Sequence, residues 1–129
     1  MGSLHSLLHI QIPVKRLDES ISWYTEHLGF MLKEHYGSSA FLALPAGPWL
    51  MLWQSSDDSH AHFSVNGQQM PTMLYATNDI HTLYEQLSQN QVSIVHYQDD
   101  GFGWVMKFYD PSGNMWGAIQ EHSALQQER

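Results

Sequence analysis

Apolar and polar residues alternate strictly from Leu8 to Ile12, which is the period of a half-buried β-strand. Leu8, Ile10 and Ile12 would share one face of this strand. His9 and Gln11 would share the other face. The alternation therefore predicts a first strand that presents one histidine and one glutamine opposite an apolar side.

A helical period follows this strand. Leu17, Ile21, Tyr24 and Leu28 recur at intervals of three and four residues, which predicts an amphipathic helix of about three turns. Gly29 stands where a helix end favours a left-handed residue. Short β-rich runs then predict three strands, from Phe30 to Tyr36, Ala40 to Leu44 and Trp49 to Gln54.

The same order of elements begins again after a polar stretch. Residues 55–69 show no apolar periodicity and are interpreted as a linker. Asn78 or Asp79 is expected to cap a second helix that starts at Ile80, and Asn90 to be its left-handed stop. Four further strands are predicted, from Met70 to Thr77, Val92 to Tyr97, Trp104 to Tyr109 and Met115 to Gln120.

The chain is thus interpreted as one α+β domain over residues 1–129, built from tandem β-α-β-β-β modules. The first module covers about residues 5–54, the linker 55–69, the second module about 70–120 and a polar tail 121–129. We expect the two modules to form a concave, partly closed mixed sheet around a shared groove.

Charge and composition narrow the classes of partner. Thirteen acidic against five basic residues give a net charge of −8, and the cations are too scattered to follow a phosphate backbone, so no nucleic acid partner is expected. The chain has no cysteine, which excludes disulfides and thiolate metal sites. No apolar run approaches the roughly 20 residues of a membrane helix, so we expect a cytoplasmic protein without a membrane partner.

Two motifs within this repeat carry a family resemblance. The segment from Leu17 to Tyr24 is followed by Leu28-Gly29-Phe30, and Asp110-Pro111-Ser112-Gly113-Asn114 precedes the final strand. In this order the chain closely resembles the vicinal oxygen chelate superfamily, from about Leu7 to Gln120. That superfamily includes glyoxalases, bleomycin-resistance proteins, fosfomycin-resistance enzymes and extradiol dioxygenases.

The resemblance implies four positions for metal ligands, one each on the first and fourth strands of both modules. Here they hold His9, Met51, Thr72 and Gly117. One imidazole, a thioether, a hydroxyl and a glycine cannot bind a divalent transition metal tightly. We therefore expect no metal cofactor, with His9 the only surviving candidate ligand should a divalent metal be used after all.

If His9 marks the concave face, a period of two assigns its neighbours. They are Gln11; Trp49, Met51 and Trp53; Thr72, Leu74 and Ala76; and Gly117 and Ile119, with Trp104, Met106 and Phe108 expected to join them. The predicted ligand-binding residues are His9, Gln11, Met51, Trp53, Thr72, Trp104, Phe108 and Gly117. For Trp53 and Trp104, a place in the core or in a dimer interface is the alternative. His60 and His62 are expected in a solvated loop.

Two functions remain open at this point. The first is a metal-independent protein resembling the bleomycin-resistance branch, expected as a homodimer, that binds or sequesters a small organic compound in an aromatic groove. A cationic aromatic compound would suit the acidic chain. The alternative is a metal-dependent lyase or dioxygenase of the glyoxalase type that uses His9. No catalytic residue can be assigned from the sequence.

Overall fold

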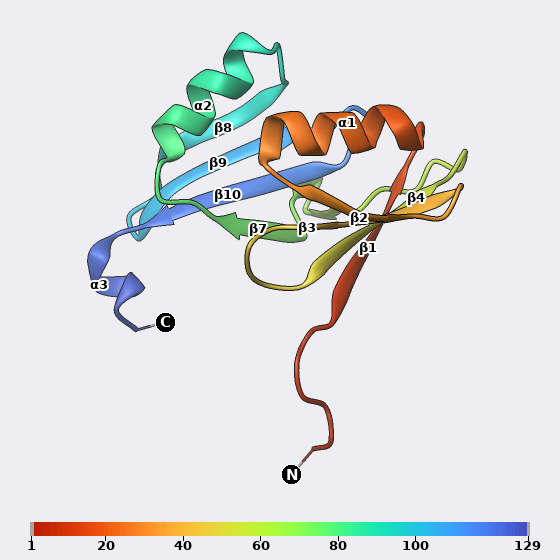
Figure 1. Cartoon of the computed structure of the whole chain (residues 1–129). Coiled ribbons are helices and arrows are strands. Elements are labelled where there is room, and N and C mark those ends of the chain that lie inside the picture. Colours follow the sequence, from red (N-terminus) through yellow and green to blue (C-terminus); the bar gives the residue numbers. More distant parts are fainter. Residues whose placement is uncertain (1, 129) are drawn as a thin grey trace. The chain divides into compact units, whose positions relative to one another are not determined.

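The computed structural model describes residues 2–128 and divides the chain into two compact units between Ser59 and His60. The division falls inside the stretch that was predicted as a linker. Each unit has a four-stranded sheet and one longer helix, and Figure 1 shows each of these helices beside its sheet. The predicted α+β class and the repeated order of elements are therefore confirmed.

The first unit contains one helix and four strands. They are β1 (His9–Val14), α1 (Leu17–Leu28), β2 (Met31–His35), β3 (Ser39–Ala43) and β4 (Trp49–Gln54). The sheet order is β1-β4-β3-β2, with β1 parallel to β4 and the other pairs antiparallel. α1 packs on β2, β3 and β4, so one face of the sheet is covered by the helix and the other is helix-free.

Apolar spacing places the core of the first unit under α1. Leu17, Ile21 and Tyr24 of the helix are buried, as are Leu50 and Leu52 of β4. The helix ends at Gly29, whose φ of 79° is left-handed and whose N–H donates to the carbonyl oxygen of Tyr24. The predicted helix and its glycine stop are confirmed.

The second unit repeats this arrangement with additions at both ends. Its elements are β5 (Phe63–Val65), β6 (Gln68–Met70), β7 (Met73–Ala76), α2 (Ile80–Gln89), β8 (Ile94–Asp99), β9 (Gly103–Tyr109), β10 (Met115–Glu121) and α3 (Ser123–Gln126). The sheet order is β7-β10-β9-β8, with β7 parallel to β10. α2 covers one face of this sheet, and β5 and β6 form a separate two-stranded sheet.

A glutamine side chain forms an equivalent hydrogen bond at the start of α1 and at the start of α2. Gln54 Oε1 accepts a hydrogen bond from the backbone N–H of Leu17 at 2.9 Å. Gln120 Oε1 accepts the corresponding bond from Ile80 at 2.8 Å. Each bond satisfies a backbone donor that the first turn of a helix leaves open. Because Gln54 and Gln120 make the same bond, they occupy equivalent positions in the two modules. Other residues of the two modules can be matched by counting from them.

The stretch predicted as a linker contains a β-hairpin. β5 and β6 pair antiparallel from Phe63↔Met70 to Val65↔Gln68. Between them Asn66 and Gly67 have φ of 51° and 82°, the two positive values that a tight hairpin turn of type I′ requires. The linker prediction was wrong for these residues, and the Asn-Gly pair was the signal that could have found the hairpin.

The caps of α2 correct a second detail. Asp79 is the N-cap, and its Oδ1 accepts a hydrogen bond from Thr82 N at 3.2 Å. Asn90 was predicted as the left-handed stop, but its φ is −96°. Gln91 takes the left-handed conformation instead, with φ of 61°. The side chain of Asn90 donates to the carbonyl of Gln86 at 2.7 Å, so it closes the helix by a side-chain bond.

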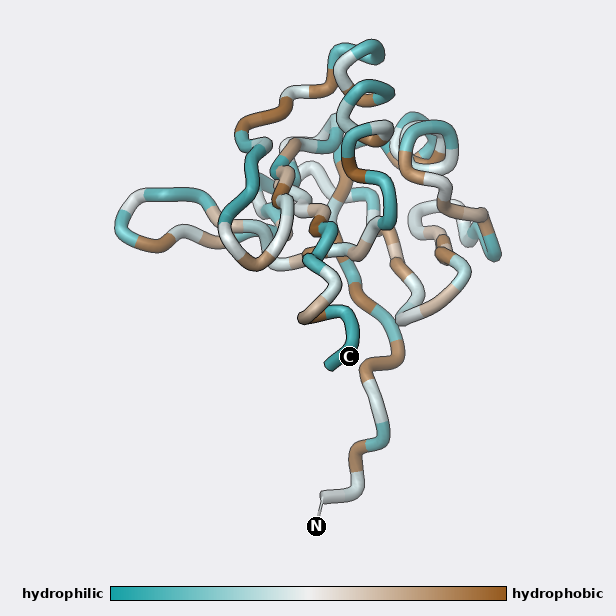
Figure 2. The backbone as a smooth tube through the Cα atoms, turned by 90° about the vertical axis from the view of Figure 1, so that its left-hand side faces the viewer, coloured by the Kyte–Doolittle hydropathy of each residue, from teal (hydrophilic) through white to brown (hydrophobic). Residues whose placement is uncertain are grey.

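Hydropathy varies along the chain between the helices and strands and the turns that join them. Figure 2 shows hydrophobic segments recurring along a trace that is hydrophilic at several of its turns. No helix among residues 2–128 is long and apolar enough to cross a membrane.

Candidate functional site

The helix-free face of the first unit carries the predicted aromatic residues. β1 and β4 run in parallel register, with His9 opposite Trp49 and Gln11 opposite Met51. Leu50 and Leu52, between these positions, are fully buried under α1. The predicted grouping on one face is therefore confirmed for His9, Gln11, Trp49, Met51 and Trp53.

Phe41 lies at the centre of this face. It is on β3 opposite Met51, and its ring is 5.1 Å from His9 and 5.8 Å from Trp49, both edge-on. Tyr36 contacts the same ring at 6.2 Å. The sequence analysis missed Phe41 because its neighbours in β3 are also small or apolar, which leaves no alternation to read. We call the set His9, Gln11, Phe41, Trp49, Met51 and Trp53 the aromatic face.

Both tryptophans of the aromatic face expose ring surface. Trp49 is 42% exposed and Trp53 is 43% exposed. Trp53 Nε1 donates to Gln11 Oε1 at 2.7 Å, which satisfies the indole donor and orients the ring. Lys33 Nζ lies 5.9 Å from the ring centre of Trp49, within cation–π range. Both indole rings are thus held in place by neighbouring side chains and keep more than two-fifths of their surface exposed.

The helix-free face of the second unit differs in chemistry. Gly117 of β10 lies opposite Leu74 of β7 and Lys107 of β9. A Cβ atom on Gly117 would meet Leu74 Cδ2 at 2.2 Å, so the leucine side chain occupies the space beside the glycine. Thr72 is exposed just before β7. The expected grouping of Leu74, Gly117 and Ile119 on one face is confirmed.

The family-implied ligand positions do not fit a metal ion. Met51 and Gly117 each precede an equivalent anchoring glutamine by three residues, so the repeat supports the predicted alignment. The first unit offers an imidazole and a thioether, and the second a hydroxyl and no side chain. Transition-metal sites in proteins need about three or more strong N, O or S donors. Within residues 2–128, no group of three His, Asp or Glu side chains is placed to hold a metal.

Three residues that were expected on the helix-free face lie on the opposite face of the second unit's sheet, which α2 covers. Trp104, Met106 and Phe108 pair with Gln120, Ala118 and Trp116, which face α2. Trp104 contacts the ring of His81 of α2 at 4.8 Å, and Phe108 is 2% exposed. The expectation that they line the groove was wrong. They pack under α2 because β9 presents Val105, Lys107 and Tyr109 to the helix-free side.

The segment with His60 and His62 is packed onto the turn before β10. The two rings stack at 5.0 Å, and His62 Nδ1 accepts a hydrogen bond from the backbone N–H of Met115 at 3.2 Å. Ala61 N donates to Asn114 Oδ1 at 2.9 Å. Burial, and secondarily the neighbouring His60, lowers the pKa of His62. The segment is a loop and His60 is exposed, as expected, but His62 is half-buried and its ring supports the start of β10.

Protonation of His62 is expected to destabilise the protein. Its pKa in the folded chain lies below the ordinary 6.5, so the unfolded chain binds the proton more tightly. This contribution to stability is present above about pH 6.5 and is lost as the pH falls through the window below that value. Urea unfolding of the wild type and of His62→Gln at pH 7.5 and 5.5 measures the effect. We expect the variant to lose less stability between the two pH values.

His5→Gln is the control for this measurement, because His5 is exposed and precedes the first strand. Its pH dependence should match that of the wild type. An equal loss of stability in the wild type and in His62→Gln would contradict the role of His62.

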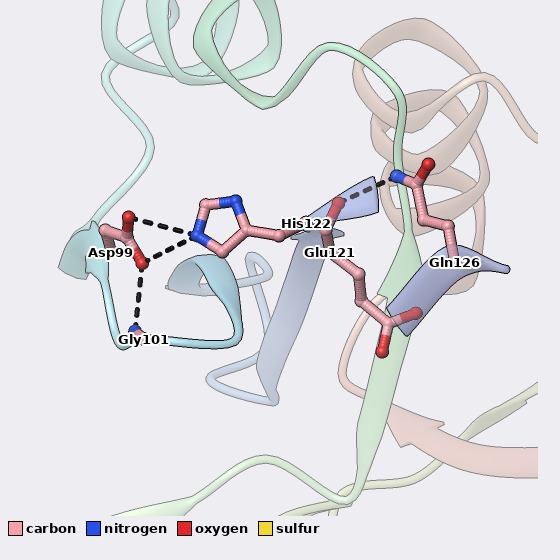
Figure 3. Close-up of polar contacts among 5 residues, drawn as sticks. All are labelled: Asp99, Gly101, Glu121, His122 and Gln126. Atoms are coloured by element: carbon pink, nitrogen blue, oxygen red, sulfur yellow. Dashed lines mark hydrogen bonds and ion pairs between the residues drawn. The ribbon is translucent and has the colours of Figure 1, made fainter. Parts of the chain in front are cut away.

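The residues after β10 are also held to the sheet. His122 Nε2 lies 3.2 and 3.1 Å from the two carboxylate oxygens of Asp99, and Gln126 Nε2 donates to the carbonyl of Glu121 at 2.7 Å (Figure 3). Gly101 N donates to Asp99 Oδ1 at 2.9 Å, and this bond is the main cause that lowers the pKa of Asp99. The predicted polar tail therefore starts with an ordered turn and the short helix α3.

Comparison with known proteins agrees with this architecture. The sequence model of the Glyoxalase/Bleomycin resistance protein/Dioxygenase superfamily matches residues 6–117. No curated protein matches the sequence.

Solved structures with the same fold include two linked to antibiotics by their descriptions. TnmS3, an antibiotic binding protein from Streptomyces sp. CB03234, is 19% identical, with a TM-score of 0.76 over 95% of this chain and 100% of that one. FosX, a fosfomycin resistance protein from Listeria monocytogenes, is 16% identical, with a TM-score of 0.77 over 98% and 99%. A glyoxylase/bleomycin resistance protein/dioxygenase domain from Frankia sp. EAN1pec is 23% identical, with a TM-score of 0.72 over 93% and 100%. At these identities the likeness concerns the fold.

Proposed function

Because the chain belongs to the glyoxalase/bleomycin resistance protein/dioxygenase superfamily, we propose that it binds a small planar organic molecule, independently of a metal ion, on its aromatic face. The observation that carries the proposal is the ring cluster around Phe41, with Trp49 and Trp53 held in place and exposed. The fold shared with TnmS3, an antibiotic binding protein, supports a small-molecule ligand.

The geometry of the aromatic face suits stacking. Exposed indole rings bind flat ligands through their π surfaces, and each such contact contributes roughly 0.5–1.5 kcal/mol beyond the area it buries. Binding needs little reorganisation, because Gln11 fixes Trp53 and Phe41 supports Trp49 and His9. The net charge of −8 favours a cationic ring system over an anionic one.

The donor set at the family's ligand positions supports metal independence. Met51 and Gly117 replace the oxygen or nitrogen donors that a divalent ion would need, and Leu74 occupies the space where a side chain at Gly117 would begin. The alternative is a metal-dependent lyase or dioxygenase, which would depend on His9 as its ligand. A cytoplasmic homodimer remains part of the proposal, as the sequence led us to expect.

Ligand titration of chelator-treated protein tests the proposal. We would follow tryptophan fluorescence and thermal stability with proflavine as a planar cation and anthraquinone-2-sulfonate as a planar anion. Wild-type protein should bind proflavine saturably and more tightly than the anion. Trp53→Ala is expected to weaken proflavine binding about tenfold, since it removes one stacking ring, worth roughly 1.4 kcal/mol at that ratio.

Trp23→Ala is the matched control, because Trp23 lies on α1 of the same unit and packs against Tyr24 and His27. It should leave proflavine affinity unchanged. Equal losses in the two tryptophan variants would contradict the aromatic face as the binding surface. A second arm adds Mn, Fe, Ni, Co or Zn to wild type and to His9→Ala. A rise in melting temperature that depends on His9 would overturn metal independence and favour the alternative.

A further inference from the structure

Lys107 is the only lysine or arginine among residues 60–128, and it lies on the helix-free face of β9. The side chain is half-buried. In the described part of the second unit no carboxylate oxygen lies within 4.0 Å of its ammonium group. A lysine whose stem packs on the sheet and whose ammonium group has no close counter-charge is free to pair with an anionic ligand.

Lys107 lines a cavity of about 410 Å³. One wall is the turn and second strand of the β5–β6 hairpin, and the others come from β8, β9 and β10. The lining residues are Gly67, Gln68, Gln69, Val95, His96, Lys107, Tyr109 and Met115. The volume falls within the range of small-molecule sites, roughly 300–1,000 Å³. Every wall belongs to the second unit, and no residue of the aromatic face is among the lining residues.

Gln69 lines the same cavity as Lys107 and offers a hydrogen-bond donor there. The Tyr109 hydroxyl donates to Gln69 Oε1, so the remaining polar group of that amide is its NH2 donor. The ring of His62 contacts Tyr109 edge-on at 6.1 Å and helps to position it. Lys107 and Tyr109 are two residues apart on one strand and therefore face the same side.

The acidic side chain on which Lys107 acts, Asp100, is already engaged by other groups. Asp100 Oδ2 lies 3.0 Å from His96 Nε2, and Asp100 Oδ1 accepts from Gln98 Nε2 at 2.7 Å. The pKa of Asp100 is lowered first by the Gln98 bond, then by His96, and least by Lys107. Asp100 thus interacts only weakly with Lys107, whose charge stays available to the cavity.

We propose that this cavity binds the oxyanion of a small molecule, a carboxylate or a phosphonate, through Lys107 and the Gln69 amide. Lysine acts here as a point charge that pairs with either oxyanion. The site goes beyond the proposed function, because it uses different residues, a different unit and the opposite ligand charge.

Amide NMR titration of the full chain tests the site. We would add benzoate, phenylphosphonate or inorganic phosphate at constant ionic strength, with chloride as the reference anion. The expected result is saturable shifts of the backbone amides of Gln69, Lys107 and Tyr109 and of the Gln69 side-chain amide. Saturation by benzoate alone would identify a carboxylate site, and saturation by the phosphorus anions alone a phosphonate or phosphate site.

Lys107→Gln should weaken the binding about tenfold or more. Arg16→Gln is the matched control, because it removes one positive charge from an exposed side chain of the first unit. It should leave the affinity unchanged. Absence of saturation with every anion, or equal binding by Lys107→Gln and wild type, would overturn the proposal. Neither result would affect proflavine binding on the aromatic face, so the two proposals fail separately.

Discussion

Replacing Trp116 with alanine is expected to lower the free energy of unfolding by about 3–5 kcal/mol. Trp116 lies on the face of β10 that is covered by α2, and it is 2% exposed. Its ring stacks on Tyr75 of β7 at 4.6 Å with an angle of 23° between the planes. Alanine would remove this contact and leave a cavity at the centre of the second unit. Urea unfolding followed by circular dichroism measures the loss.

The pKa of Tyr75, which stacks on Trp116, provides a second measurement of the same substitution. The buried environment raises the pKa of Tyr75 to about 12. Trp116→Ala should bring that pKa back toward the ordinary 10.0, because water would reach the phenol. Spectrophotometric titration of tyrosinate in wild type and variant compares the two values.

Trp49→Ala provides the matched control, since Trp49 is 42% exposed on the aromatic face. We expect it to cost no more than about 1 kcal/mol. If Trp116→Ala were no more costly than Trp49→Ala, Trp116 would not be a core residue of the second unit.

Alternation in the sequence correctly predicted which residues of a strand lie on the same side. It was less successful at predicting whether that side is the helix-free face or the face under the helix. In β1 the polar side chains His9 and Gln11 fall on one side only, and the family resemblance at His9 indicated which face this side forms. In β9 both sets are apolar or aromatic apart from Lys107, and Trp104 and Phe108 were assigned to the wrong side. Lys107 was the available signal, because a lysine is rarely placed under a packed helix.

The candidate sites were less predictable than the strands, because they depend on pairing between distant segments. Phe41 joins the aromatic face only through its pairing with Met51 on β4. The cavity at Lys107 needs the β5–β6 hairpin and the bond from Tyr109 to Gln69, which are 40 residues apart in sequence. Periodicity within one segment contains no information on such contacts. The Asp110 to Asn114 motif indicated a turn, but its second contact, with the segment around Ala61, could be read only from the structure.

Asn114→Ala is expected to lower the free energy of unfolding by about 2–4 kcal/mol, because the buried carboxylate of Asp110 and the part-buried N–H of Ala61 each lose a partner. Asn114 is fully buried, and its Nδ2 donates to Asp110 Oδ2 at 2.9 Å. Its Oδ1 accepts from Ala61 N at 2.9 Å. Asp110 Oδ1 accepts from the backbone N–H groups of Ser112 and Asn114, so the aspartate closes the turn while the asparagine ties it to the preceding segment. Urea unfolding measures the loss.

The control is Asn90→Ala, whose side chain makes one exposed bond to the carbonyl of Gln86 and should cost no more than about 1 kcal/mol. Equal losses in the two asparagine variants would contradict the role of Asn114. The tie to Ala61 also positions His62, because Ala61 is its neighbour in the chain. Asn114→Ala should therefore reduce the His62-dependent loss of stability at pH 5.5 as well. That result would show that the turn before β10 supports the segment that packs against Tyr109, and through it one wall of the cavity at Lys107.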